Sequence, residues 1–463
     1  MKRKLLIALL LSIVSFNEIS YATSSGNDLV QVILNGQNIV PEVSPRIVNN
    51  RTMVPIRDII SKVGGSIEWN SSENSVVIKN KNDTIVFKIG QNTAKVNDED
   101  TVIEVPPYIL EGRTMVPLRF IATKLDMNVE WIDRLKTATV TDNDYFNSLS
   151  KDVVMGFTVS YYTGDNLSYN SVKSSQKLNM VSVFSYSFDT NGNIKLADEE
   201  QKNTVEYAKG KNIIPLAVIH NINNGQFDQE ILHDVLVNEQ ARQNLINNIV
   251  IMLAQHGYSG VNIDFENIKR SDKDYYTTFI SELKGTLTKY GYLTTVSVAA
   301  KTSDVYTSSW NYAFDYKRLG ELADYVMIMA YDEHYKSSMP GPIASINWVR
   351  DILDYAQKQI PTQKIILGLA LYGYDWQNST GQAVPAKNVA NLAKNNNVNI
   401  KWDENSKTPY FSYIKGNVYH EVWYENEESL KLKINLAKQY NLGGVGFWRL
   451  GLEEQGVLDK IVK

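Results

Sequence analysis

From about residue 150 onward, short apolar runs alternate with longer segments in which apolar residues recur every three or four positions. The short runs predict buried strands, and the periodic segments predict amphipathic helices. The predicted strands cover 153–160, 180–188, 213–219, 260–266, 293–300, 325–331, 364–372 and 443–448. Strands that alternate with helices in this way predict an α/β fold, a (β/α)8 or TIM barrel, over residues 150–463. A doubly wound open sheet is the alternative, although no glycine-rich phosphate loop follows the first strand.

Two of the predicted helices have well-marked ends. The segment 238–255 stops before Gly257 and carries one apolar face: Ala241, Leu245, Ile249, Met252 and Leu253. The segment 271–290 opens with Ser271 and Asp274 at the spacing of a helix cap, and Gly291 follows it. Its predicted buried face comprises Tyr275, Phe279, Leu283 and Leu287.

An internal repeat precedes the barrel. "RTMVPIRDI" at 51–59 returns as "RTMVPLRFI" at 113–121, and "SIEWNSSENSVVI" is matched by "NVEWIDRLKTATV". Each copy predicts a short helix that begins at a proline, Pro55 or Pro117, followed by two paired strands such as 66–69 and 75–78. The first helix is predicted to end at Gly64-Gly65. We therefore expect a small pseudo-symmetric α+β module over residues 28–143, which either binds a partner or only stabilises the barrel.

The first 22 residues have the pattern of a secretory signal. Lys2, Arg3 and Lys4 precede an apolar run at 5–16, and Ser20-Tyr21-Ala22 supplies small residues for cleavage. A membrane anchor is the alternative, but the run is short for a bilayer span. We expect a secreted, extracellular protein that is not held in a membrane after cleavage.

Composition narrows the chemistry further. The chain has 463 residues, a formal charge of -4 and no cysteine, which excludes disulfides and thiol catalysis. The nearly even charge gives no support for a nucleic-acid partner. The five histidines lack metal-ligand spacing, so we expect no cofactor. The 27 tyrosines would suit carbohydrate binding. We also expect the protein to be a monomer.

Candidate chemistry is concentrated in "SGVNIDFENI" at 259–268. Asn262, Asp264 and Glu266 occupy alternate positions and share one face of the predicted fourth strand. The apolar residues between them suit the outer helices, so the polar set should face the barrel interior. Buried carboxylates cost several kcal/mol each without partners. Their place at the carboxyl end of a barrel strand predicts an active site.

This segment resembles the signature of glycoside hydrolase family 18, D-x-x-D-x-D-x-E. The last two acids match Asp264 and Glu266, whereas Ser259 and Asn262 replace the first two. Further motifs follow in order: "MAYD" at 329–332, "LALYGYDW" at 369–376 and "GVGFWRLG" at 444–451. The pattern is most similar to the branch that contains spore-cortex-lytic N-acetylglucosaminidases. The repeat module resembles the copper amine oxidase N-terminal-like domain, a stalk or attachment module. All five histidines lie outside the module, so copper is not expected there.

The resemblance implies roles for individual residues in a substrate-assisted, retaining mechanism. Glu266 would be the general acid and base, and Asp264 would hold the sugar's acetamide and stabilise positive charge. Tyr331 would hydrogen-bond the acetamide carbonyl. The remaining implied substrate-binding residues are Asn262, Asp332, Trp448, Tyr372 and Tyr374. Ordinary packing or a solvated strand end is the alternative for Tyr331, Asp332 and Trp448, and packing is the alternative for Tyr372 and Tyr374. Since Asn262 is neutral, we expect Asp264 to ionise readily over a wide range of acidic pH.

Two departures from the family bear on the substrate. "VIHNIN" at 218–223 stands where many chitinases have Ser-x-Gly-Gly. The hairpin-like "YFSYIKGNVYHEVWYE" at 410–425 is small for the insertion that walls a deep chitinase cleft. We therefore expect an exported glycosidase that cuts next to N-acetylglucosamine in peptidoglycan of the cell wall or spore cortex, with the module attached to the wall. The alternatives are a chitinase acting on chitin oligomers and a non-catalytic sugar-binding barrel.

Overall fold

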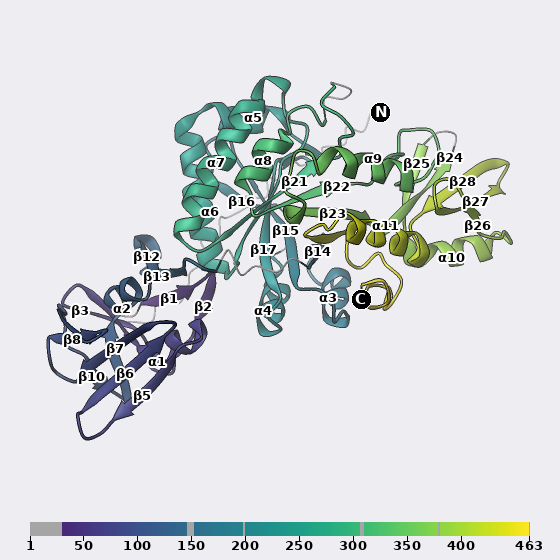
Figure 1. The fold of residues 1–463 in the computed structure, drawn as a ribbon. Helices are drawn as coiled ribbons and strands as arrows, with labels where there is room; N and C mark the ends of the chain where they lie inside the picture. Colours follow the sequence, from purple (N-terminus) through teal and green to yellow (C-terminus); the bar gives the residue numbers. More distant parts are fainter. Residues whose placement is uncertain (1–29, 146–151, 198–199, 306–309, 378–379, 463) are drawn as a thin grey trace, which may run out of the picture.

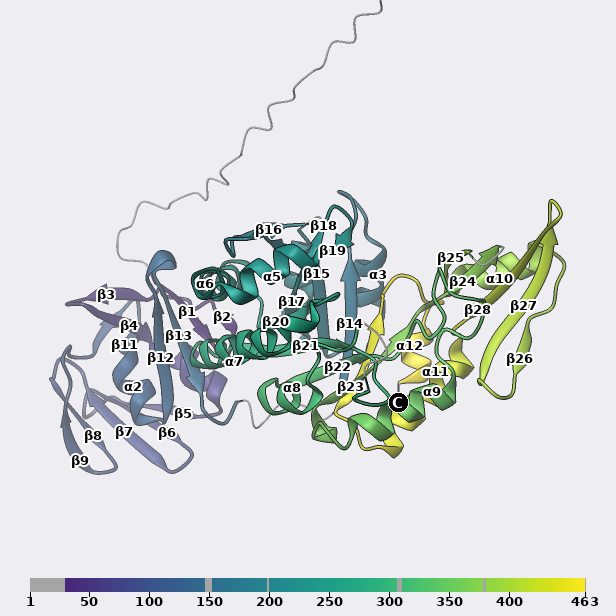
Figure 2. The same cartoon turned by 90° about the horizontal axis from the view of Figure 1, so that it is seen from above.

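The structure, a computed structural model, describes residues 30–145, 152–197, 200–305, 310–377 and 380–462. The predicted signal segment lies outside the described residues. Within them, no helix combines the length and apolarity that a membrane span needs. Figures 1 and 2 show a small β-rich module at one end of the molecule, a barrel of strands and helices in the middle, and a strand-rich insertion at the other end.

The predicted barrel is confirmed. Its eight parallel strands are β14 (Val153–Val159), β15 (Met180–Phe188), β17 (Ile214–His220), β20 (Gly260–Asp264), β21 (Leu293–Ala299), β22 (Tyr325–Met329), β23 (Ile365–Ala370) and β29 (Gly444–Trp448). They pair in this order, and pairing of β29 with β14 closes the ring. Each strand begins and ends within two residues of its predicted limits. The strands are buried on both faces, which explains their nearly continuous apolar sequences.

Helices cover the outside of the barrel. They are α3 (Leu167–Ser174), α4 (Lys202–Gly210), α5 (Gln229–Val237), α6 (Glu239–His256), α7 (Lys273–Lys289), α8 (Tyr316–Leu322), α9 (Ile346–Ala356), α11 (Glu427–Gln439) and α12 (Val457–Ile461). Helix α6 begins where the Asn238 side chain accepts a hydrogen bond from Ala241 N, and Gly257 ends it at φ 75°. All five residues predicted for its apolar face are buried.

The prediction for α7 was partly wrong. A 3-10 turn at Arg270–Asp272 delays the helix, so the expected cap by Ser271 does not form. The Ser271 hydroxyl instead donates a 2.8 Å hydrogen bond to Asp272. The delay leaves Tyr275 45% exposed and buries Tyr276 against the core. Phe279, Leu283 and Leu287 are buried as predicted.

The insertion between β23 and α11 is larger than the predicted hairpin. The hairpin exists as β27 (Thr408–Lys415) and β28 (Val418–Tyr424). It belongs to a five-stranded antiparallel sheet completed by β24 (Tyr372–Gln377), β25 (Thr380–Pro385) and β26 (Lys401–Asp403). Helix α10 (Ala386–Asn395) packs its apolar face on this sheet. Strand β24 was not predicted as a separate strand because it follows β23 after a single residue, so the two strands read as one.

The module is built from the predicted repeat. Helices α1 (Ile56–Ile60) and α2 (Leu118–Lys124) each begin after the expected proline. Strand pairs follow each helix: β5 (Ser66–Asn70) with β6 (Ser75–Asn80), and β12 (Met127–Ile132) with β13 (Thr137–Asp142). The other strands are β1 (Gln31–Leu34), β2 (Gln37–Ile39), β3 (Arg46–Val48), β4 (Arg51–Pro55), β7 (Asp83–Lys88), β8 (Thr93–Val96), β9 (Glu99–Val102), β10 (Tyr108–Leu110) and β11 (Arg113–Pro117).

The module packs tightly against the amino-terminal end of the barrel strands. A Cβ atom on Gly36, which has φ 70°, would lie 3.1 Å from the backbone of Ser259 and Gly291. Thr141 Oγ1 donates a 3.3 Å hydrogen bond to the Lys289 carbonyl. Ile33 of the module is buried in the same apolar cluster as the barrel helices. The module and the carboxyl ends of the barrel strands therefore lie on opposite sides of the barrel.

Candidate active site

Strand β20 divides its side chains as predicted. Ile263 and the adjoining Phe265 pack outward into the helix layer. Asn262 points inward, where its amide donates a 2.9 Å hydrogen bond to Thr295 Oγ1 and accepts one of 2.9 Å from Ser297 Oγ. Because both polar ends of its fully buried side chain are engaged within the barrel, we assign Asn262 to anchoring β20 on β21 rather than to contacting sugar.

Asp264 lies one step nearer to the mouth of the barrel. Its side chain is 4% exposed, and its Oδ1 atom has no hydrogen-bond partner among the described residues. Burial alone raises the pKa of Asp264 to about 7. The expectation of ready ionisation at acidic pH was therefore wrong, because it considered only like-charge repulsion and not desolvation.

Glu266 follows directly after the strand and is held through its backbone. The Asn221 side chain accepts a 3.0 Å hydrogen bond from Glu266 N and donates one of 2.9 Å to the Glu266 carbonyl. Burial, then the charges of Asp264 and Asp332, raise the pKa of Glu266 well above its ordinary value. The raised pKa favours the protonated form of Glu266, which is the form that is able to donate a proton. Asn221 lies in the segment 218–223 but was not predicted as a site residue.

The segment after β22 brings two more predicted residues to the same place. Burial, then the charges of Asp264, Glu266 and Asp332, raise the pKa of Tyr331. The Tyr331 hydroxyl therefore remains a hydrogen-bond donor beside the carboxyl pair. Asp332 has a left-handed backbone, φ 61°, which turns the chain at this point.

Tyr372 and Tyr374 hold Asp332 in place. The Tyr372 hydroxyl donates a 2.6 Å hydrogen bond to Asp332 Oδ1, and the Tyr374 hydroxyl also hydrogen-bonds this carboxyl. Burial raises the pKa of Asp332, and these two hydrogen bonds partly offset the rise. Both tyrosines are at least nine-tenths buried, so they position Asp332 more than they offer surface to a ligand.

Trp448 closes the inner core at the mouth of the barrel. Its ring meets the edges of Phe157 and Phe184, with centroids 5.6 and 5.5 Å away. The side chain is only partly buried. It is therefore both core and candidate sugar platform.

His220 is a candidate that sequence reasoning overlooked. It ends β17, is paired in register with Asp264, and stacks on Phe184 at 4.3 Å. Its Nδ1 accepts a 3.1 Å hydrogen bond from Ile222 N, so the proton of the neutral ring lies on Nε2. Burial lowers the pKa of His220 to about 4. The alternation Leu216, Val218, His220 along an inward face was the signal available in the sequence.

Exposed aromatic side chains surround this end of the barrel. Tyr161 and Tyr162 follow β14, Trp310 follows β21, and Tyr335 follows β22. Because parallel strands end at the same rim, these side chains lie on the same end as the carboxyl cluster. Aromatic rings of this kind provide apolar faces for sugar rings.

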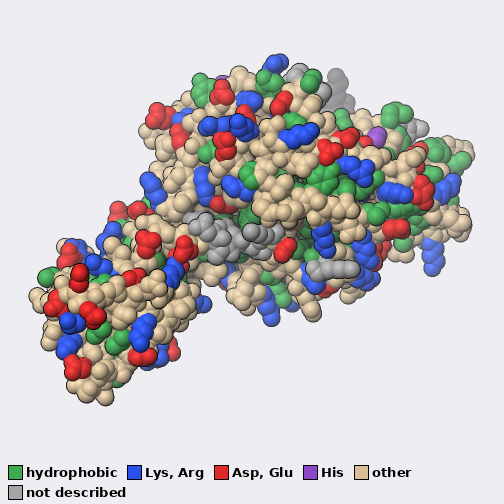
Figure 3. All heavy atoms as spheres, in the orientation of Figure 1, with side chains coloured by type: hydrophobic (Ala, Val, Ile, Leu, Met, Phe, Trp, Pro, Cys, Tyr) green, Lys and Arg blue, Asp and Glu red, His purple; other side chains and the backbone are tan. Residues whose placement is uncertain are grey.

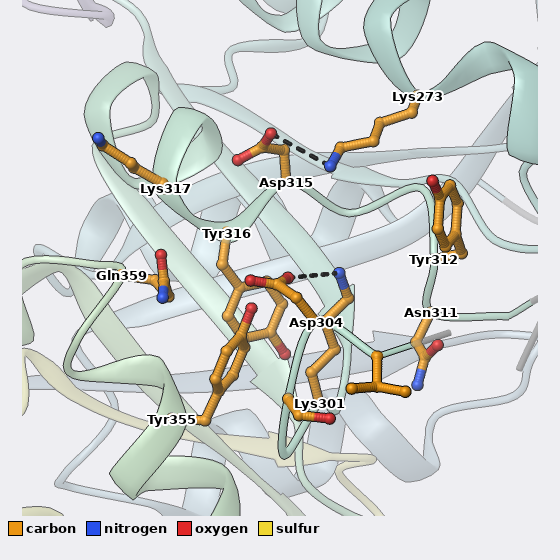
Figure 4. A pocket seen from close by; sticks show the side chains of 12 residues that line it. Lys273, Lys301, Asp304, Asn311, Tyr312, Asp315, Tyr316, Lys317, Tyr355 and Gln359 are labelled. Atoms are coloured by element: carbon orange, nitrogen blue, oxygen red, sulfur yellow. Dashed lines mark ion pairs between the residues drawn. The ribbon is translucent and has the colours of Figure 1, made fainter. Parts of the chain in front are cut away.

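A separate polar pocket lies beyond the end of β21, with a volume of about 280 Å³ (Figure 4). Two ion pairs cross it, Lys273 to Asp315 at 3.4 Å and Lys301 to Asp304 at 3.8 Å. None of its lining residues belongs to the carboxyl cluster, so we assign it no part in the chemistry. Among the described residues, no group of three or more His, Asp or Glu side chains is arranged to hold a metal ion.

Comparison with known proteins agrees with this geometry. Residues 157–453 match the family model for glycosyl hydrolases family 18, and residues 33–140 match that for the copper amine oxidase N-terminal domain. The uncharacterized glycosylase YvbX of Bacillus subtilis is 36% identical over 66% of this chain and 91% of its own length. The cortical fragment-lytic enzyme of B. subtilis is 31% identical over 62% of this chain and 68% of its own.

Solved structures show the same likeness. The spore cortex-lytic enzyme SleL of Bacillus megaterium superposes with a TM-score of 0.62 at 29% identity, over 68% of this chain and 74% of its own. A chitinase from Chromobacterium violaceum gives a TM-score of 0.63 at 29% identity, over 67% and 98%. The chain therefore belongs to glycoside hydrolase family 18, as a member related to spore cortex-lytic enzymes that carries a copper amine oxidase N-terminal domain.

Proposed function

We propose that this protein hydrolyses the β-linked bond next to N-acetylglucosamine in bacterial peptidoglycan, of the spore cortex or the cell wall. The observation that carries the proposal is the carboxyl pair at the mouth of the barrel, formed by the buried Asp264 and the partly buried Glu266. Glu266, whose pKa is raised well above its ordinary value, is suited to protonate the leaving oxygen. Asp264, with a pKa of about 7, is the member of the pair that ionises first.

The mechanism that fits this pair is substrate-assisted retention. In that mechanism the sugar's own acetamide oxygen attacks the anomeric carbon and forms an oxazolinium ion. Ionised Asp264 would hold the acetamide N–H and stabilise the developing positive charge. The Tyr331 hydroxyl would donate to the acetamide oxygen. Glu266, having lost its proton to the leaving group, would then take a proton from the attacking water.

Peptidoglycan is favoured as substrate by the relatives that act on spore cortex. A chitinase acting on chitin oligomers is the second candidate, favoured by the structural likeness to the C. violaceum chitinase and by the five-stranded insertion, whose strand β24 contacts Asp332. The retained acid pair disfavours a non-catalytic sugar-binding barrel.

The proposal includes a place of action outside the membrane. The basic start and apolar run of residues 2–16 support export, and the repeat module supports attachment to the wall. The module contacts the barrel on the side away from the carboxyl pair, so it can bind a wall polymer without covering that pair.

Mass spectrometry of reaction products tests this function. The purified chain is incubated with cortex peptidoglycan, vegetative peptidoglycan and chitin oligomers, with Glu266→Gln as the inactive control. From peptidoglycan we expect muropeptide fragments that end in a reducing N-acetylglucosamine. From chitin oligomers we expect slower release of shorter oligomers. Efficient cleavage of chitin oligomers with intact peptidoglycan would establish the chitinase instead, and no cleavage of any substrate would favour the sugar-binding barrel.

A further inference from the structure

The two repeats of the module are related by a pseudo-twofold axis. Equivalent residues are 62 positions apart in the chain, as Arg51 and Arg113 show. In the antiparallel pair β4–β11, Val54 lies opposite Val116, which is its own repeat equivalent. A residue that pairs with its own equivalent marks the axis. Features of one repeat therefore recur on the other side of the module.

Two surface clefts of the module are related by this symmetry. The first cleft contains Trp69 and Arg57 of the first repeat with Arg113 of the second, and has a volume of about 330 Å³. The second cleft, of about 750 Å³, contains Trp131 and Arg119 with Arg51. Each of the ten residues that line the first cleft has its equivalent, 62 positions away, in the lining of the second. Both clefts lie across the boundary between the repeats, so each needs both copies.

The matching extends to ion pairs at the edge of each cleft. Arg113 pairs with Glu42, and Arg51 pairs with Glu104, which is the repeat equivalent of Glu42. The glutamates hold these guanidinium groups at the clefts, whereas the exposed side chains of Arg57 and Arg119 form no ion pair within the described part of the chain.

Folding alone does not require this likeness. Matching residues are expected in the core, because both repeats must bury equivalent faces. Trp69, however, is 47% exposed, Trp131 is partly exposed with one side against the module core, and the side chains of Arg57 and Arg119 are exposed. Other exposed positions differ between the repeats, such as Ser66 and its equivalent Asn128. The clefts therefore keep their surface chemistry where neighbouring surface has changed.

The side chains specify a class of ligand. An indole face accepts the apolar face of a sugar ring, and guanidinium groups bind carboxylates through paired hydrogen bonds. Figure 3 shows acidic and basic side chains interspersed over the visible face of the module, so this face presents no broad field of one sign to a polyanion. Attraction for a ligand carboxylate must therefore act locally in each cleft, where the indole ring and the guanidinium groups lie close together. Peptidoglycan offers both partners, since its sugar rings carry peptide stems with carboxylates.

We propose that the two clefts are equivalent binding sites for peptidoglycan strands, each stacking a sugar ring on its tryptophan and pairing a stem carboxylate with its arginines. The choice of peptidoglycan rests on the proposed function. Two sites on one rigid module hold the enzyme on an insoluble polymer by avidity, which commonly strengthens binding 10²- to 10⁴-fold. The carboxyl pair stays uncovered, because the module is packed on the opposite side of the barrel.

Sedimentation with insoluble peptidoglycan, freed of phosphate polymers, tests the proposal. The full chain carrying Glu266→Gln is used so that the polymer is not digested. Trp69→Ala and Trp131→Ala should each weaken binding about tenfold, and the double variant about 100-fold or more. Lys79→Gln, on an exposed strand position outside both clefts, is the matched control and should bind as the parent does.

A second pair of variants and a second polymer separate the outcomes. Arg57→Gln with Arg119→Gln changes only exposed side chains, and should weaken binding to peptidoglycan even if the alanine variants do not fold. Chitin, which has sugar rings without stem carboxylates, should bind at least tenfold more weakly than peptidoglycan. Equal sedimentation of parent and double tryptophan variants, or dependence on phosphate polymers, would overturn the proposal. Hydrolysis of soluble fragments by the unaltered chain reports separately on the proposed function.

Discussion

His220 and Asp264 lie opposite each other in the paired strands β17 and β20, and each carries a buried polar atom with no hydrogen-bond partner among the described residues. These atoms are His220 Nε2 and Asp264 Oδ1. The imidazole is neutral because burial lowers its pKa to about 4, while burial raises the pKa of Asp264 to about 7. The barrel interior therefore sets the protonation of both groups by desolvation.

The pH dependence of catalysis should follow Asp264. If its ionised form stabilises the oxazolinium ion, the acidic limb of kcat/KM should lie near pH 7. His220→Phe keeps a ring against Phe184 but removes the N–H dipole, so the limb should move up by about half to one pH unit. Initial rates on a soluble N-acetylglucosaminide from pH 4 to 9 measure the position of the acidic limb in the parent and in His220→Phe. A limb near pH 4 in the parent would contradict the role of burial.

Asp264→Asn should stabilise the folded protein while abolishing activity. The pKa of Asp264 is about 7 when folded and about 3.9 when unfolded, so stability falls as pH rises from 4 to 7 and the full penalty persists above 7. The amide removes this penalty, and we expect the free energy of unfolding to rise by about 1–4 kcal/mol at pH 8. At pH 4 the difference should be small. Chemical denaturation at the two pH values provides the comparison, and equal stability at pH 8 would show that the carboxyl is not desolvated.

Glu266→Gln should lower turnover about 10²- to 10⁴-fold, because the amide preserves size but cannot donate the proton. The binding of substrate should change little. Turnover and KM on soluble muropeptide are the measurements. A variant that keeps most of its turnover would mean that another group is the acid.

Asn221→Ala should reduce kcat about tenfold or more with little change in KM, because Asn221 positions the acid through the backbone of Glu266. The pH profile should keep its shape, which distinguishes misplacement of Glu266 from a changed pKa. Asn223→Ala is the matched control in the same loop, since the side chain of Asn223 is exposed and bonds only to Asp228 among the described residues. Equal losses in the two variants would point to the loop as a whole.

The sugar's acetamide should prove to be the nucleophile. A thiazoline mimic of the oxazolinium ion should inhibit strongly, and the product should first appear as the β-anomer. Glycan without N-acetyl groups at the cleaved sugar should not react. Proton NMR of the fresh product identifies the anomer, and an initial α-anomer would rule out the roles proposed for Asp264 and Tyr331.

The sequence by itself determined the barrel, the repeat and the acid pair. Period-two and period-3.6 patterns depend on neighbours in the chain, so the eight strands and the buried face of α6 could be predicted to within two residues. The alternation through Asp264 and Glu266 likewise specified one inward face. The predicted start of α7 was wrong by two residues, because Ser271 bonds to Asp272 instead of capping the helix.

Only the tertiary structure decided what each polar group does. The amide of Asn262 is hydrogen-bonded to Thr295 and Ser297, and burial sets the pKa of Asp264. Neither the hydrogen bonds nor the burial can be seen in the local sequence. The contact of Asn221 with Glu266 joins residues 45 positions apart, and the two clefts of the module each combine residues of both repeats. Desolvation and long-range contacts depend on which strands become neighbours, and that is fixed only when the barrel closes and the two repeats pair.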